Sequence, residues 1–140
     1  MTESELVMVL AKAWNTLDSS LLAPYLADGV VYESQQVLAP LVGKEAVLDH
    51  LHQKMLSLRD APADRKYYCE IGNCGSQRGM RVMVMSAVEG KPCVVLAIGN
   101  RDKPVALVLL ETADCLIKRV DISTVVPHPS TAIRSGEYPA

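Results

Sequence analysis

The second half of the chain contains short apolar segments that do not alternate with polar residues. Three of them, Val82–Val88, Cys93–Ile98 and Val105–Leu110, are apolar at both odd and even positions. A strand with one face in water alternates apolar and polar residues, so these segments predict a sheet that is covered on both faces. Segments rich in Gly, Asn, Asp and Pro separate them, and such breaks are typical of antiparallel hairpins.

The first half of the chain has the apolar spacing of helices. Thr2 and Glu5 form a capping-box pattern ahead of an apolar stripe that ends in Trp14 and Leu17. Asp18 can then cap a second, shorter helix, whose apolar residues lie within Leu21–Leu26. The sequence therefore predicts a helical N-terminus.

A turn, a strand and a third helix are expected next. Asp28-Gly29 is a turn signal, and a short strand should run from Val30 to about Gln36. After the loop that ends at Gly43, the apolar residues of a helix share one face: Val47, Leu48, Leu51, Met55 and Leu58. The order is helix, helix, strand, helix and antiparallel meander, which predicts an α+β fold with mostly N-terminal helices.

The length of the chain indicates one domain. Folding 140 residues removes about two thirds of the chain's surface from water, which is enough for one core. The segment 127–140 has no apolar periodicity, so we expect a single domain over 1–126 and a mobile C-terminal tail. A net charge of −2 without any block of like charge argues against nucleic acid and membrane surfaces as partners.

The N-terminal residues and the four cysteines point to an intracellular protein without a metal. Glu3 and Glu5 stand where a signal peptide has positive charge, and no apolar run is long enough for a membrane span, so we expect a cytoplasmic location. Cys69 and Cys74 should point to opposite faces of a strand, and we expect the cysteines to be buried, reduced thiols. Cofactor-binding motifs are absent from the sequence, so no cofactor is expected.

The two-sided apolar strands also predict a partner. Helices can cover only one face of such a sheet, so the other face should pack against a second copy of the chain. We therefore expect a homodimer that forms through the open face of the sheet.

The helical half resembles the nuclear transport factor 2-like superfamily, in the branch of polyketide-cyclase-like and ketosteroid-isomerase-like proteins. The resembling segments are Ala13–Asp18, Leu22–Ser34 and Leu41–Val47, with their Leu-Ala-Asp turn and Gly-Lys-Glu-Ala helix entry. The resemblance implies a cystatin-like cone, in which a strongly bent antiparallel sheet wraps around a long helix. It also implies a pocket at the open end and a dimer.

The sequence departs from the isomerase pattern at two positions. The aspartate that ends the first strand and acts as the base corresponds to Ser34, beside Glu33, and the helical tyrosine corresponds to Leu10. Serine does not accept a proton at neutral pH without a base beside it, and leucine cannot donate a hydrogen bond. The isomerase mechanism is therefore not expected.

Other residues could form a binding site at the open end of such a cone. Tyr32, Ser34 and Gln36 share one parity of the first strand and could orient a ligand through hydrogen bonds. Trp14 should form a pocket wall. Alternatively, Tyr32 belongs to the core and places only its hydroxyl at the rim.

His50 and Asp121 are the candidates for a catalytic proton carrier. His50 borders the apolar face of its helix and points about 200° away from His52, so the two imidazoles cannot bind one metal. Arg119 shares a parity with Asp121 and is a candidate ligand-binding residue. A few hydrolases of the superfamily use an Arg-bridged carboxylate pair, for which Glu111 would have to supply the second carboxylate. A structural histidine and a structural salt bridge are the alternatives.

Two functions remain open from the sequence. One is a dimeric domain that binds a small apolar organic molecule in an apolar pocket. The other is a cofactor-free acid–base enzyme, an isomerase, dehydratase or hydrolase, that acts on a small apolar substrate.

Overall fold

The computed structural model describes residues 1–35, 39–76, 88–125 and 127–140. The α-helices of this part are α1 (Glu3–Thr16) and α2 (Lys44–Leu58). Its strands are β1 (Leu26–Ser34), β2 (Leu41–Val42), β3 (Tyr67–Asn73), β4 (Pro92–Ile98), β5 (Pro104–Ala113), β6 (Leu116–Ser123) and β7 (Ile133–Arg134). The strand expected over 82–88 falls on residues of which only Val88 is described.

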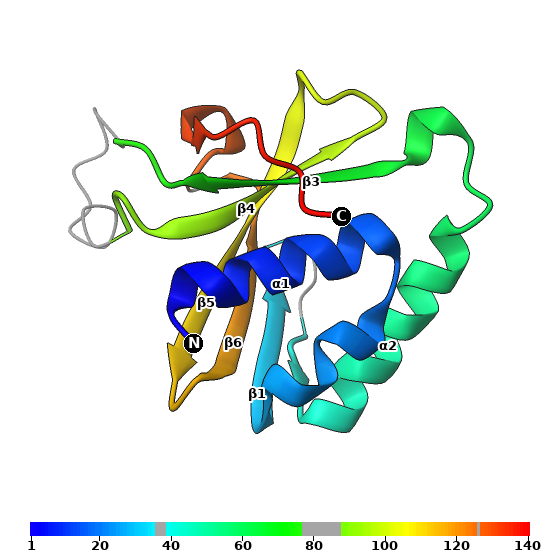
Figure 1. The fold of residues 1–140 in the computed structure, drawn as a ribbon, viewed down its shortest axis with the longest axis vertical. Helices are drawn as coiled ribbons and strands as arrows, with labels where there is room; N and C mark the ends of the chain where they lie inside the picture. The colour runs from blue at the N-terminus through cyan, green and yellow to red at the C-terminus, as the bar shows by residue number, and fades with distance from the viewer. Residues whose placement is uncertain (36–38, 77–87, 126) are drawn as a thin grey trace.

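The described strands form one sheet in the order β2-β1-β6-β5-β4-β3-β7. α1 crosses one face of this sheet, and α2 lies beside it (Figure 1). The predicted α+β class with N-terminal helices is confirmed. One pairing differs from an antiparallel sheet, because β1 runs parallel to β6. The chain joins these two strands through α2 and the β3–β5 meander, a crossover long enough for parallel pairing.

α1 begins at the predicted capping box. The Glu5 N–H donates to the Thr2 hydroxyl at 3.2 Å, and the Thr2 N–H donates to the Glu5 carboxylate at 3.2 Å. These bonds satisfy two backbone donors that a helix start otherwise leaves free. The bond from the Thr2 N–H to the Glu5 carboxylate also lowers the pKa of Glu5. The predicted stripe is buried through Leu6, Leu10 and Trp14.

The segment between α1 and α2 differs from the prediction. Ser19–Leu21 and Ala23–Tyr25 form two short 3₁₀ turns instead of one α-helix. Pro24 has no N–H and disfavours the α conformation of the residue before it, so a continuous helix is unfavourable here. Asp28-Gly29 is not a turn either: β1 passes through it, with a shift in register against β6 between Leu26 and Val31.

The apolar residues of the sheet are buried on both faces, as the non-alternating strands predict. α1, α2 and one face of the sheet enclose the larger cluster, to which Leu10, Leu51 and Leu110 belong. A smaller cluster lies on the other face of the sheet and consists of Cys74, Cys93, Val95, Leu107 and Leu109, with Val88 and Ala132 packed against it. Its buried residues are at most 9% exposed within a single chain. The dimer stays a prediction, because residues of the same chain cover this part of the second face.

The C-terminal segment 127–140, expected as a tail outside the domain, packs onto the sheet instead. β7 pairs with β3, and Pro129–Thr131 forms a 3₁₀ turn. Gly72 and Gly75 make the close approach possible: an added Cβ would lie 2.7 Å and 1.8 Å, respectively, from carbonyl oxygens of this segment. The sequence pattern could not reveal this packing, because the contacts are polar and depend on residues far away in the chain.

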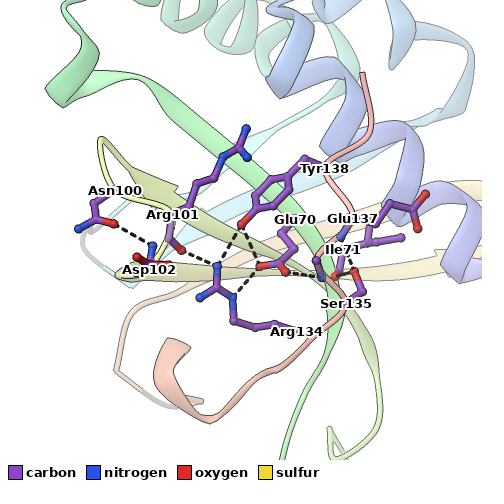
Figure 2. A network of polar contacts seen from close by, with 10 residues as sticks. Glu70, Ile71, Asn100, Arg101, Asp102, Arg134, Ser135, Glu137 and Tyr138 are labelled. Atoms are coloured by element: carbon purple, nitrogen blue, oxygen red, sulfur yellow. Dashed lines mark hydrogen bonds and ion pairs between the residues drawn. The ribbon is translucent and has the colours of Figure 1, made fainter.

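A buried carboxylate anchors the C-terminal segment (Figure 2). Glu70 on β3 has a side chain that is only 3% exposed, and its Oε1 accepts a hydrogen bond from Arg134 Nε at 2.6 Å. The Gly136 N–H donates to the other carboxylate oxygen at 2.6 Å, and the Tyr138 hydroxyl lies 3.5 Å from Oε1. Arg101 stacks on the Tyr138 ring at 4.4 Å. The segment thus belongs to the fold.

The cysteines differ in exposure, and this difference predicts a labelling experiment. Cys69, Cys74 and Cys93 are buried, but Cys115 is exposed in the turn between β5 and β6, which corrects the expectation of four buried thiols. We expect a disulfide reagent at pH 8 to modify one thiol per native chain rapidly and the other three only after unfolding. A second fast thiol would contradict this arrangement.

In the described ranges, no helix is long and apolar enough to cross a membrane.

Candidate functional site

A cavity of about 380 Å³ lies between the helices and the face of the sheet that they cover. Most of its wall is apolar, and the strands β3 to β6 supply most of the lining side chains. Its lining residues are Trp14, Tyr32, Ser34, His50, Lys54, Tyr67, Cys69, Leu96, Ile98, Val105, Ala106, Val108, Val120, Ile122 and Thr124. This volume is at the small end of the range for sites that hold small organic molecules.

The alternation of β1 decides which of its side chains reach the cavity. Tyr32 and Ser34 line it, whereas Glu33 between them points to the other face of the sheet. Burial raises the pKa of the Tyr32 hydroxyl well above its ordinary value. The hydroxyl therefore remains protonated at neutral pH, where it can donate or accept a hydrogen bond. Gln36, the third residue expected in this set, lies outside the described residues.

Two pairs of aromatic rings line the cavity. The rings of Trp14 and Tyr67 lie 5.4 Å apart between centroids, and those of Tyr32 and His50 lie 5.2 Å apart. Trp14 is only 8% exposed, so it forms a rigid wall, as expected. Tyr67 was not among the expected site residues, because nothing in the sequence shows that the first residue of β3 comes to lie beside α1.

His50 and Lys54 stand one turn apart on α2, and both are exposed where the cavity meets solvent. Lys54 Nζ lies 6.0 Å from the centroid of the Tyr67 ring. The sequence pattern predicted His50 as a site residue, but Lys54 was not predicted. Lys54 could have been predicted from its position four residues after His50, since residues four apart on a helix share a face.

Arg119 and Asp121, expected as ligand-binding and catalytic residues, do not line the cavity. On β6 the residues Val120 and Ile122 face it, so Arg119 and Asp121 point to the opposite face. Arg119 Nε contacts the Asp121 carboxylate at 3.0 Å, and its Nη2 forms an ion pair with Glu33 on β1. An arginine does bridge two carboxylates, but the second one is Glu33 rather than Glu111, and the group lies outside the cavity.

The buried thiol of Cys69 forms part of the cavity floor. Burial raises its pKa to about 12, so the sulfur remains a neutral thiol and a poor nucleophile at neutral pH. Asn15 holds the backbone here: its amide accepts from the Cys69 N–H and donates to the Cys69 carbonyl, each at 2.8 Å. The same amide donates to the Pro139 carbonyl at 2.7 Å and so links the C-terminal segment to this wall.

Metal-binding side chains do not gather anywhere in the described part of the chain: it holds no group of three or more His, Cys, Asp or Glu residues that could hold an ion. The chemistry available at the cavity is therefore that of hydroxyls, an imidazole, an ammonium group and apolar walls.

No protein-family model and no curated protein sequence matches this chain. Solved structures, in contrast, do match it. An uncharacterized cystatin-fold protein from Novosphingobium aromaticivorans is 15% identical over 87% of this chain and 97% of its own, with a TM-score of 0.58. An NTF2-like protein of unknown function from Cytophaga hutchinsonii is 13% identical over 87% of this chain and 88% of its own, with a TM-score of 0.54. An LEH-like epoxide hydrolase from M. tuberculosis is 16% identical over 91% of this chain and 84% of its own, with a TM-score of 0.50.

At these identities the similarity shows the fold alone. The chain has the nuclear transport factor 2-like fold, a cystatin-like α+β architecture, as the resemblance of its helical half implied. This fold hosts proteins with different activities, so the function has to be argued from the site.

Proposed function

We propose that this protein binds a small apolar organic molecule in the cavity between its helices and its sheet. The observation that carries the proposal is the composition of the wall: a volume of about 380 Å³ lined mainly by apolar side chains, with the hydroxyls of Tyr32 and Ser34 among them. Apolar walls supply affinity, and a few converging polar groups fix the orientation of a ligand.

Binding is better supported than the alternative, acid–base catalysis. A cofactor-free isomerase, dehydratase or hydrolase needs a proton carrier at the reacting atom. The described lining residues include one imidazole, His50, and no carboxylate. Asp121, the other candidate, lies on the opposite face of the sheet. Of the two proton carriers that the sequence suggested, only His50 lines the cavity.

The chain contains its own reporter for this proposal. Trp14 is the only tryptophan of the chain and lines the cavity. We expect 1-octanol, a neutral probe, to change the Trp14 emission in a saturable way and to raise the melting temperature, because a ligand that binds only the native state stabilises it. The proposal fails if the wild-type protein shows neither effect with 1-octanol or with the eight-carbon probes octanoate and octylamine.

Filling the cavity with a larger side chain should weaken the binding of 1-octanol. Ala106 on β5 is 3% exposed and lines the cavity, so Ala106→Phe should weaken 1-octanol binding about tenfold or more. Ala113→Phe, at the exposed end of the same strand, is the matched control and should bind as the wild type does. Circular dichroism of both variants separates lost binding from lost folding. Unchanged binding in a folded Ala106→Phe variant would place the probe elsewhere.

The homodimer is a separate part of the proposal. Light scattering should give twice the mass of one chain, and a mass of one chain would overturn it. Exposed apolar side chains that a partner could cover include Val42 at 64% and Ile133 at 63% exposure.

A further inference from the structure

The charged groups at the cavity have one sign. Among the described lining residues, Lys54 is cationic and none is acidic. In the same ranges Lys54 forms no ion pair, and its ammonium lies over the Tyr67 ring. A ligand in the cavity would therefore meet a positive charge at the end that opens to solvent.

Nearby carboxylates of the sheet are engaged elsewhere. Glu33 and Asp121 pair with Arg119 on the opposite face of the sheet, and Glu70 pairs with Arg134 under the C-terminal segment. Because all three carboxylates pair with an arginine, none of them neutralises Lys54. The ammonium is free to pair with a group that a ligand brings.

The neutral polar groups that line the cavity also suit an anionic group of a ligand. Tyr32 and Tyr67 carry hydroxyls, and a protonated hydroxyl can donate a hydrogen bond to an anionic oxygen. A hydrogen bond between a charged donor and a carboxylate is stronger than one between neutral groups. The remaining wall, which includes Leu96, Val108 and Ile122, is apolar.

We propose that the ligand is a hydrophobic monocarboxylate whose carboxylate pairs with Lys54 while its apolar part fills the cavity between Trp14 and the strands. This inference rests on the proposed function and adds the chemical class of the ligand. A volume of about 380 Å³ equals that of roughly a dozen water molecules in the liquid, so a ligand of about a dozen non-hydrogen atoms fits.

Three probes with the same chain test the class: octanoate, 1-octanol and octylamine. Each is titrated against Trp14 fluorescence, with the melting temperature as a second readout. We expect octanoate to bind about tenfold more tightly than 1-octanol, and octylamine to bind more weakly than both. The order should reflect the head group alone, since the apolar part is the same.

Two variants of α2 test whether the positive charge of Lys54 binds the carboxylate. Lys54→Gln should weaken octanoate binding about tenfold and change 1-octanol binding less than twofold. Lys44→Gln removes the same charge at the other end of α2 and should leave both affinities unchanged. Both lysines are outside the buried core, so the variants should fold.

The outcomes separate the two proposals. If 1-octanol binds in the cavity but octanoate binds no better, or if Lys54→Gln leaves octanoate affinity unchanged, the carboxylate inference is overturned and the proposed function stands. Tighter binding of octylamine than of octanoate overturns it as well. If none of the three probes changes the Trp14 emission or the melting temperature, the proposed function itself fails.

Discussion

Arg134→Ala is expected to lower the free energy of unfolding by about 2 kcal/mol, because it leaves the buried Glu70 carboxylate without its cation. The hydrogen bond to Glu70 raises the pKa of the Arg134 guanidinium above its ordinary value, so this guanidinium is charged in the native protein. The Arg134 side chain is 32% exposed, which puts the loss below that of a fully buried pair. Urea denaturation monitored by circular dichroism measures the change.

A second substitution distinguishes a buried charge from lost packing. Glu70→Gln introduced into the Arg134→Ala protein should restore part of the stability, because a neutral amide tolerates the buried position better than an unpaired carboxylate. Arg65→Ala, an exposed arginine, is the control and should change stability by less than about 0.5 kcal/mol. If Arg134→Ala is as stable as the wild type, Glu70 does not anchor the C-terminal segment.

Gly99→Ala should destabilise the protein by about 3 kcal/mol for two independent reasons. Gly99 has a φ of +75°, a left-handed conformation that costs alanine about 1–2 kcal/mol. An added Cβ would also lie 2.4 Å from the backbone oxygen of Asp64, and overpacking of this kind costs about 1–3 kcal/mol. Because Gly99 follows Ile98, which lines the cavity, the same variant should also weaken probe binding.

Gly90→Ala separates these two contributions. Gly90 has a φ of +81°, but an added Cβ would meet nothing within 4 Å. The variant should therefore show only the conformational cost, about 1–2 kcal/mol. Equal losses in the two variants would mean that the segment around Asp64 moves away without cost, and the steric part of the argument would be wrong.

The local elements could largely be predicted from the sequence. The capping box at Thr2 and the buried faces of both helices follow from hydrogen bonding and apolar spacing within a few residues. The non-alternating segments predicted strands with two buried faces, and β4 and β5 have them. Pro24 shows where such local signals were overlooked, since its effect on the preceding residue already disfavoured a second α-helix.

The candidate site could be predicted only in part. Strand alternation groups Tyr32 with Ser34 and groups Arg119 with Asp121, but it does not say which group faces the helices. Both groups were assigned to the cavity, and only the first lines it. On α2 the helical spacing that predicted His50 as a site residue also places Lys54 on the same face, so Lys54 could have been predicted from the sequence.

By itself, then, the sequence determined where helices and strands form and which residues share a face, because capping, turn formation and apolar spacing act over a few neighbouring residues. Only the tertiary structure decided which face of β1 and β6 encloses the cavity, and that the C-terminal segment packs against the sheet and adds β7 to it. Those outcomes depend on contacts such as Glu70 with Arg134, which are 64 residues apart in the chain. No local pattern encodes such a contact, since its free energy exists only once the sheet has brought the two side chains together.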